Sequence, residues 1–489
     1  MNLNMKSTIK ISGIVLMVIG FSMLPSVFVS FLYDDGPDVL IPFLVTALAS
    51  IYVGYLVTWA LRGTPTRTLK VRDGFLVVIV CWLVSAILGA IPFYVTGAIQ
   101  NPFDAFFESC SGFSTAGSSI LLDIEALPRG LLFWRSFTHW IGGMGILVFA
   151  IALLPSLGIS GQNVAVSEST GPTLTKPSSK MTDVAKGLYL TYLLFTIVET
   201  ILLMFGGMDL YDALLHTFGT VGTGGFSSYN TSIAHFDSTY IDIVITVFML
   251  LCGINFNLYL LMLRRGFHAF WDDAEFRLYL AIIIISSAAI CLTVLFTQTY
   301  TSVKDAAIDS TFQTVSILTS TGYATADYES WPMFCQAIIF LLMLIGGCSS
   351  STGGGLKVIR ILVIFQLIRR GISTRLHPNV VETIKPSNQN MPPDVVSAIA
   401  SHMFLFTAMV FFGAFVVSFE NCDLATAFSS VITALGNVGP GFGSIGPTEN
   451  FGALSNLSKF LLSIYMIAGR LELYSLFILL MPRFWNTHN

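Results

Sequence analysis

Four short stretches of this sequence combine an oxygen-bearing side chain with a glycine, a combination suited to binding a cation. They read Ser-Thr-Ala-Gly at 114–117, Gly-Thr-Gly-Gly at 222–225, Thr-Ser-Thr-Gly at 319–322 and Gly-Asn-Val-Gly at 436–439. Successive carbonyl oxygens can replace the hydration shell of a monovalent cation. Such carbonyl rows need residues with positive φ, which glycine adopts without steric cost. The four stretches therefore predict four cation-coordinating loops.

The four stretches belong to an internal repeat. The 14-residue segments 104–117, 212–225, 309–322 and 426–439 align without gaps, and each begins with Asp or Thr, which are good N-caps for a helix. A single such loop would most simply be an ordinary polar turn. Four loops in register favour a shared function, so we predict four short pore helices, each followed by a filter loop.

A second polar stretch, GGCSSSTGGGLKVIR at 346–360, interrupts a long apolar run. Gly and Ser pairs are recognised causes of helix kinks. A polar, flexible break below a filter could act as a gate, or it could be a simple kink that lets helices pack closely. The spacing G-x-x-x-x-G-K-[ST] of a phosphate-binding loop is absent.

Two charges, Arg470 and Glu472, fall inside the last apolar run. Charges within a membrane are costly and usually functional. Two residues that are two positions apart on a helix do not face each other, so the two should not pair directly. Arg470 could face the ion pathway as an electrostatic barrier, or it could bind another helix or a carbonyl group.

The elements that must position these loops are transmembrane helices. The chain has 489 residues, of which 54% are hydrophobic and 11% charged, against roughly 25% charged residues in soluble domains. Long apolar runs of the length needed to cross about 30 Å of hydrocarbon predict ten spanning helices. They lie at about 11–31, 41–62, 75–97, 131–156, 187–206, 240–263, 278–297, 331–368, 393–418 and 455–481.

The positions of the basic residues predict the orientation of these helices. Clusters around residues 62–72, 176–186, 264–277 and 369–385 mark cytoplasmic loops by the positive-inside rule, and Lys6 and Lys10 place the N-terminus there too. The C-terminus is then also cytoplasmic, and all four filter loops enter from the opposite side. Repeats of equal orientation are related by an axis along the membrane normal.

The predicted fold is therefore an all-α polytopic membrane protein around a central pore. Two leading helices precede four parallel pseudo-repeats of helix, pore helix, filter loop and helix. The expected divisions are a hairpin at 1–62 and repeats at 63–160, 161–266, 267–376 and 377–489, the third of which holds the intramembrane loop.

Other chemistries find little support. The seven cysteines show no C-x-x-C spacing, and no metal-ligand spacing joins the polar residues of the apolar segments, Glu108, His139, Glu199 and His216. We expect these four residues to be hydrogen-bonded packing, with a smaller chance that they line an outer vestibule. A membrane-embedded enzyme would need a converging catalytic set, and none is visible. A sensor or scaffold without transport is a third possibility.

At the level of motifs, the chain resembles the Trk/Ktr/HKT superfamily of potassium transporters, and the Trk-type transmembrane subunits most closely. The resemblance covers nearly the whole length. It rests on WIGGMGILV (140–148), TGGFSSYN (223–230), GINFNLYLL (253–261), EFRLYL (275–280), GGCSSSTGGGLKVIR (346–360), HPNVV (377–381) and GRLELY (469–474).

The resemblance implies potassium uptake across a bacterial cytoplasmic membrane, with one pore per chain and K⁺ as the transported ion. By this resemblance the filter residues are Thr115, Ala116, Gly117, Thr223, Gly224, Gly225, Ser320, Thr321, Gly322, Asn437, Val438 and Gly439. The gate residues are Gly346, Gly347, Ser350, Ser351, Thr352, Gly353, Gly354, Gly355 and Arg470.

The filter residues also bear on ion selectivity. In some plant relatives a serine replaces the first filter glycine and sodium permeates; Gly117 is intact here, which favours potassium. The loops lack a Gly-Tyr-Gly ending, so we expect looser selectivity than in a potassium channel. A sodium-dependent Ktr-type uptake subunit, or a less selective potassium and sodium transporter, is the alternative.

The resemblance further implies a homodimer and a cytoplasmic ring of nucleotide-binding regulatory subunits of the TrkA type. The chain itself has no nucleotide-binding motif and no organic cofactor is expected, nor a nucleic-acid partner; membrane lipid surrounds it. The basic loops 158–186, 264–277 and 369–392 are the expected docking surface for the ring.

Overall fold

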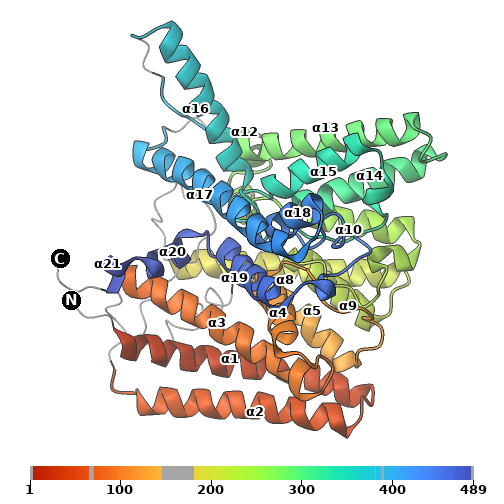
Figure 1. Ribbon diagram of the computed structural model, residues 1–489, viewed down its shortest axis with the longest axis vertical. Coiled ribbons are helices and arrows are strands. Elements are labelled where there is room, and N and C mark those ends of the chain that lie inside the picture. Colours follow the sequence, from red (N-terminus) through yellow and green to blue (C-terminus); the bar gives the residue numbers. More distant parts are fainter. Residues whose placement is uncertain (1–3, 65–70, 146–180, 380–381, 387–389, 486–489) are drawn as a thin grey trace.

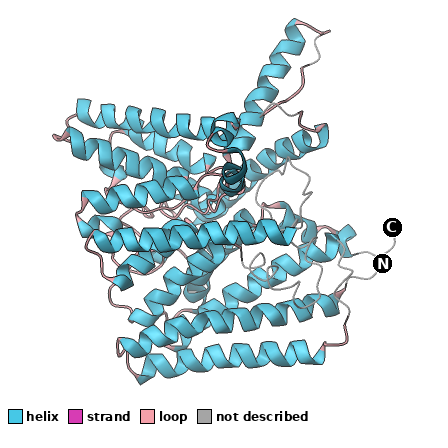
Figure 2. Ribbon diagram, turned by 180° about the vertical axis from the view of Figure 1, so that it is seen from behind, coloured by secondary structure: helices cyan, strands magenta, loops and turns pink. Residues whose placement is uncertain are grey.

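A computed structural model describes residues 4–64, 71–145, 181–379, 382–386 and 390–485. Within these ranges the regular structure is helical (Figure 2). Outside the pore helices, the α-helices are α1 (Met5–Leu32), α2 (Pro37–Ala60), α3 (Val71–Val95), α5 (Arg129–Gly143), α8 (Met181–Phe205), α10 (Thr239–Cys252), α11 (Phe256–Arg265), α12 (His268–Asp272), α13 (Ala274–Phe296), α15 (Met333–Ile345), α16 (Val358–Leu376), α17 (Pro393–Val417), α19 (Asn456–Arg470), α20 (Tyr474–Leu480) and α21 (Pro482–Trp485). The four pore helices are described below.

The helix lengths suit a membrane protein. Six helices of the described ranges, α1, α2, α3, α8, α13 and α17, are long and apolar enough to cross a bilayer. Two bent pairs pass the same test, α10 with α11 and α19 with α20. Their outer faces carry large apolar side chains, which is the arrangement expected where the solvent is lipid.

The predicted leading hairpin is present as α1 and α2. Figure 1 shows the two helices side by side, with α1 between α2 and the rest of the bundle. Three glycines let the backbones approach closely: a β-carbon at Gly54 would come within 2.5 Å of the carbonyl oxygen of Gly13, and one at Gly20 within 2.8 Å of that of Ala47. Small residues at helix contacts are typical of membrane proteins.

The four predicted pore helices are confirmed. They are α4 (Pro102–Ser114), α9 (Leu210–Gly222), α14 (Val303–Leu318) and α18 (Leu424–Gly436), and each follows a long outer helix. The predicted N-caps, Asp104, Asp212, Asp309 and Thr426, are wrong. Each pore helix begins earlier, at a cap whose side chain accepts an amide hydrogen bond: Asn101, Asp209, Ser302 and Asp423.

The second long helix of the repeats is interrupted more often than predicted. The prediction of continuous helices at 240–263 and 455–481 is wrong, because α10 and α11 meet at 84° and α19 and α20 at 115°. The break at Gly253 lets its carbonyl accept a hydrogen bond from the amide of Cys348, at 2.9 Å. The break predicted at 346–360 is confirmed, since α15 ends at Ile345 and α16 begins at Val358. Residues 146–156 of the predicted fourth helix lie outside the described ranges.

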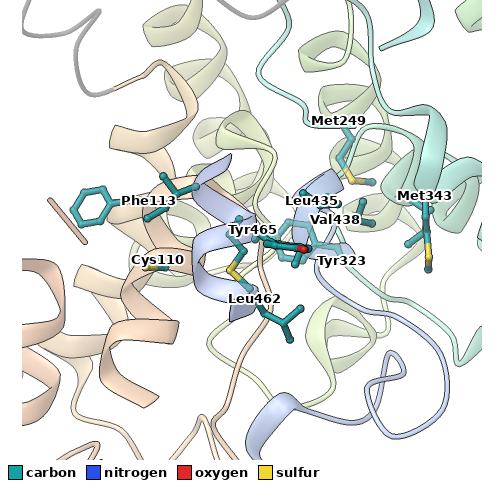
Figure 3. Packing of buried hydrophobic residues seen from close by; sticks show 14 of the residues in the cluster. Cys110, Phe113, Met249, Tyr323, Met343, Leu435, Val438, Leu462 and Tyr465 are labelled. Atoms are coloured by element: carbon teal, nitrogen blue, oxygen red, sulfur yellow. The ribbon is translucent and has the colours of Figure 1, made fainter. Parts of the chain in front are cut away.

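The buried core gathers around the filter loops. Figure 3 shows side chains from all four repeats packed together, including Phe113, Met249, Tyr323 and Val438. At one end of the bundle, the guanidinium carbon of Arg72 in α3 lies 5.0 Å from the ring centre of Phe484 in α21. The start of α3 and the helix α21 therefore lie together.

Candidate functional site

The four filter loops share one backbone conformation. In each, the residue two positions before the filter glycine has a left-handed φ: 60° at Thr115, 53° at Thr223, 57° at Ser320 and 51° at Asn437. The glycine two residues later again has positive φ: 76° at Gly117, 75° at Gly225, 82° at Gly322 and 105° at Gly439. This alternation turns successive carbonyl groups to the same side, which is the geometry that cation coordination needs.

The loops meet in a closed ring. A β-carbon added to Gly117 would collide with the carbonyl oxygen of Gly224, one at Gly225 with that of Thr321, and one at Gly322 with that of Val438. A β-carbon at Gly439 would lie 3.1 Å from the carbonyl oxygen of Ala116. Each repeat thus contacts the next, and the fourth contacts the first. A shared axis follows from this cyclic order.

The ring opens into a cavity on one side. All four filter glycines line it, together with Arg135, Tyr229, Asn230 and Glu449 among others. The loops around it are joined to one another: Ser118 donates to the carbonyl oxygen of Gly439 at 3.1 Å, and the amide of Gly443 donates to Glu329. Partial burial raises the pKa of the Glu329 carboxyl, an effect that the Gly443 amide opposes.

The side chains at the other end of the ring differ between repeats. Thr115 Oγ1 and Asn437 Oδ1 are buried and have no hydrogen-bond partner among the described residues. Thr223 donates to the carbonyl of Gly222 at 2.7 Å, and Ser320 to that of Thr319 at 2.6 Å. Buried oxygen atoms are rarely left unpaired, so Thr115 Oγ1 suits a passing cation as a partner. The side chain of Asn437 is directed at α19 instead, where its Nδ2 donates to the carbonyl of Met466 at 3.0 Å.

The predicted gating loop lies directly against the ring. The amide of Gly354 donates to Ser320 Oγ. A β-carbon at Gly353 would come within 2.6 Å of the carbonyl oxygen of Thr319, and one at Gly354 would collide with that of Gly436. The loop therefore packs beneath the third and fourth filter loops, at the end away from the cavity.

A carboxylate that the sequence analysis did not single out holds this loop in place. Glu275, at the start of α13, is buried and accepts three hydrogen bonds, two from the loop and one from the first turn of α16. Ser349 donates from its amide and from its hydroxyl, both at 2.6 Å, and Ile359 donates from its amide at 3.1 Å. The motif EFRLYL pointed to this glutamate only through the family resemblance.

The loop also contacts the break of the second repeat. Besides the bond from Cys348 to Gly253, the amide of Phe256 donates to the carbonyl of Ser350 at 3.1 Å, and Thr352 Oγ1 donates to that of Cys252 at 3.3 Å. Each broken helix leaves backbone groups without intrahelical partners. Here the polar groups of the loop and the unpaired backbone groups at the break form hydrogen bonds with one another.

Arg470 joins three repeats. Its guanidinium donates to the carbonyl oxygens of Thr352 at 2.6 Å, Gly142 at 2.8 Å and Gly143 at 2.6 Å. The sequence is compatible with Arg470 as a pathway barrier or as a group bound to carbonyls, and the carbonyl-bound geometry is the one present. Glu472 does not pair with Arg470, as predicted; it forms an ion pair with Arg360 of α16.

The other polar residues of the apolar segments are mostly hydrogen-bonded, as expected. His139 Nδ1 lies 2.8 Å from the carbonyl of Gly112, and His216 Nε2 lies 2.9 Å from Ser227 Oγ. Glu108 pairs with Arg135, which the sequence analysis missed. Glu199 is fully buried in α8, and neither of its carboxyl oxygens has a hydrogen-bond partner in the described part of the chain.

The basic loops expected to dock a partner are described only in part. Residues 158–180 lie outside the described ranges. Arg264 and Arg265 end α11 and are exposed, and Arg369, Arg370 and Arg375 lie on α16, which projects from the bundle (Figure 1).

Comparisons with known proteins agree on one family. A family model named TrkH, described as a cation transport protein, matches residues 43–486. The chain is 36% identical over 499 residues to the Trk system potassium uptake protein TrkH of Vibrio parahaemolyticus, with 99% of each chain covered. It is 34% identical over 488 residues to the protein of the same name from Escherichia coli K12, covering 99% of this chain and 100% of that one.

A solved structure gives the same result for the fold. The crystal structure of the potassium transporter TrkH from Vibrio parahaemolyticus superposes with a TM-score of 0.88 at 34% sequence identity. The superposition covers 99% of this chain and 100% of that one.

Proposed function

Because this chain belongs to the TrkH family of cation transport proteins, we propose that it carries potassium ions across the membrane through the ring of four filter loops. The observation that carries the proposal is the cyclic contact of each filter glycine with the carbonyl of the next repeat. The relatives that this chain matches over almost their full length are named potassium uptake proteins. Transport, rather than enzymatic catalysis, is the activity that the ring supports.

The backbone supplies the chemistry of ion binding. The carbonyl oxygens of Ala116, Gly224, Thr321 and Val438 stand in for the water that a potassium ion sheds. Each pore helix also directs its negative C-terminal end towards the ring, which favours a cation. The side-chain oxygen of Thr115 provides a further binding position at the end away from the cavity.

The membrane potential can drive the uptake. Moving one charge across 100 mV is worth about 2.3 kcal/mol, so an interior-negative potential concentrates potassium without a second substrate. Coupling to sodium, as in a Ktr-type subunit, is the alternative that the transport assay below distinguishes.

The loop 346–355 is the gate in this proposal. It lies across the end of the ring opposite the cavity, held by Glu275 and Arg470. Opening requires these hydrogen bonds to break, and the broken helices α15 and α16 supply a hinge. A cytoplasmic nucleotide-binding ring would act by pulling on α16, whose exposed basic end includes Arg369 and Arg370.

The further parts of the assembly follow from the family and are proposals as well. Residues 1–62 form a leading hairpin, and the repeats occupy 63–160, 161–266, 267–376 and 377–489. Two chains form a dimer with one pore each, in a bacterial cytoplasmic membrane with both chain ends inside.

The experiment is a reversal-potential measurement. The purified chain is reconstituted in liposomes with gradients of potassium, rubidium or sodium. We expect a potassium-selective current with rubidium tolerated, and Gly322→Asp should abolish both the current and the potassium-dependent growth of an uptake-deficient strain. Growth rescue that persists in several filter-glycine variants would contradict the pore. Current that appears only with sodium present would favour the sodium-dependent alternative.

A further inference from the structure

A buried ion pair lies directly behind the filter ring. Arg135 of α5 donates from Nε to Glu108 Oε1 of α4 at 2.6 Å, and the two side chains are 2% and 0% exposed. Breaking such a pair by removing one partner leaves an uncompensated buried charge. The transport chemistry described above makes no use of either residue.

Glu108 holds the segment that follows the first filter glycine. The amide of Ile120 donates to Glu108 Oε2 at 3.0 Å, and Ser119 Oγ donates to Glu108 Oε1 at 3.0 Å. These residues follow Gly117 by two and three positions. The carboxylate therefore fixes where the first filter loop leaves the ring.

Arg135 holds the corresponding segment of the second repeat. Its Nη1 donates to the carbonyl of Ser227 at 3.0 Å, and its guanidinium carbon lies 3.5 Å from the ring centre of Phe226. Phe226 and Ser227 come directly after Gly225. One ion pair thus sets two adjacent filter loops relative to each other.

The position of Glu108 is repeated in the other pore helices. Aligned with the repeat, it corresponds to His216, Gln313 and Ser430. His216 Nε2 lies 2.9 Å from Ser227 Oγ, and Gln313 donates to the carbonyl of Ala326 at 3.1 Å. In the fourth repeat Ser430 donates within its own helix, and the neighbouring Ser429 accepts from the amide of Phe442 at 2.9 Å.

Each repeat therefore braces its filter loop from the pore helix, with a different side chain. Among these four side chains, the carboxylate of Glu108 is the one that pairs with an arginine, and this arginine contacts the filter loop of the second repeat. We propose that Glu108 and Arg135 are positioning residues that set the potassium-to-sodium selectivity of the ring. The inference rests on the proposed transport function, because it assigns a role in that same ring.

The charge balance adds a second consequence. Arg135 reaches the wall of the cavity above the ring. Glu108 neutralises it there, so loss of the carboxylate places a net positive charge beside the entering cations and lowers the conductance as well.

The test uses the full chain in liposomes, with reversal potentials under opposed potassium and sodium gradients. Glu108→Gln keeps the shape of the side chain and removes its charge. Arg135→Lys keeps the charge but loses the planar guanidinium group that contacts both Phe226 and Ser227. Each variant is expected to lower the potassium-to-sodium permeability ratio about fivefold, the equivalent of one hydrogen bond of ~1 kcal/mol.

Asp104→Asn is the matched control. Asp104 lies on the same pore helix, one turn before Glu108, and forms a 2.8 Å ion pair with the buried Lys459 of α19. This variant should lose stability and keep the wild-type ratio, which separates loop positioning from a general loss of a buried charge pair.

The outcomes are distinct for the two proposals. A wild-type chain that passes no potassium would overturn the proposed function. A selective wild type whose ratio is unchanged in Glu108→Gln and Arg135→Lys would overturn the inference alone. If Glu108→Gln does not insert as a folded protein, Arg135→Lys decides, because it keeps the buried charges paired.

Discussion

The guanidinium of Arg470 donates a hydrogen bond to the carbonyl oxygen of Thr352 at 2.6 Å. The two residues come from different repeats, and Thr352 belongs to the loop that lies beneath the filter ring. With further bonds to Gly142 and Gly143, the arginine ties that loop to the first and fourth repeats at once. In this structure the loop is therefore held in place from outside its own repeat.

Replacing Arg470 should release the loop. Arg470→Gln removes hydrogen bonds to a charged group, each worth about 1.5–3 kcal/mol. We expect basal potassium flux in liposomes without any regulatory partner to rise roughly tenfold, which corresponds to about 1.4 kcal/mol. Arg265→Gln, at an exposed arginine of α11, should leave the flux unchanged. A flux that stays at the wild-type level in Arg470→Gln would argue against the gate.

Replacing Glu275, which holds the loop from its other side, should also raise the basal potassium flux. Glu275→Gln keeps the size but brings an amide group against the donors Ser349 and Ile359, so at least one of the three bonds is lost at a cost of about 1–3 kcal/mol. Basal flux should rise, and the stimulation by a regulatory partner should fall.

The control for Glu275 is Glu382→Gln. Glu382 also accepts a hydrogen bond from a serine hydroxyl, that of Ser373 at 2.8 Å, but it lies at the far end of α16. Equal effects of the two substitutions on basal flux, measured without a partner, would contradict a specific role for Glu275.

The filter ring should have no room for one additional methyl group on a filter glycine. Gly322→Ala places a β-carbon against the carbonyl oxygen of Val438 at a φ of 82°. We expect loss of potassium flux measured with rubidium as tracer. Gly207→Ala is the matched control, since Gly207 has a φ of 97° and open space around its β-carbon position. That control carries the backbone strain, of order 1 kcal/mol, without the collision, so it should retain flux.

The leading hairpin offers a prediction about stability. Gly54→Ala pushes a methyl group into the backbone of Gly13, an overpacking that typically costs about 1–3 kcal/mol. The melting temperature in detergent should fall. Gly371→Ala, in α16 with nothing within 4 Å, should leave it unchanged or raise it slightly. A hairpin that tolerates Gly54→Ala without loss would show that the two helices can separate.

Local patterns predicted the parts of the fold that are determined locally. The four pore helices and loops were found because their residue types recur at fixed spacing, and the loop at 346–355 because its polarity interrupts an apolar run. The N-caps were misplaced by three residues in three repeats. In two of these repeats the misleading residue was Asp104 or Asp212, because an acidic residue is also favourable within the first turn of a helix.

Other features depend on contacts between distant parts of the chain. A glycine such as Gly253 is tolerated in a helix, so the bend there could not be predicted without its contacts to the distant loop, such as the bond from Cys348. The carbonyls that Arg470 binds lie up to 328 residues away in the sequence. The aligned repeats place Glu108 and Gln313 at the same position of the pore helix. That these side chains hold the filter loops follows only from where those loops lie in the structure.

The bond between Ser118 and the carbonyl of Gly439 joins residues 321 positions apart and closes the ring. A ribosome must therefore deliver nearly the whole polypeptide before any conducting path exists. A truncated product or a half-inserted chain has no complete ring of oxygen atoms, so it cannot dissipate the cell's ion gradients while synthesis is still under way.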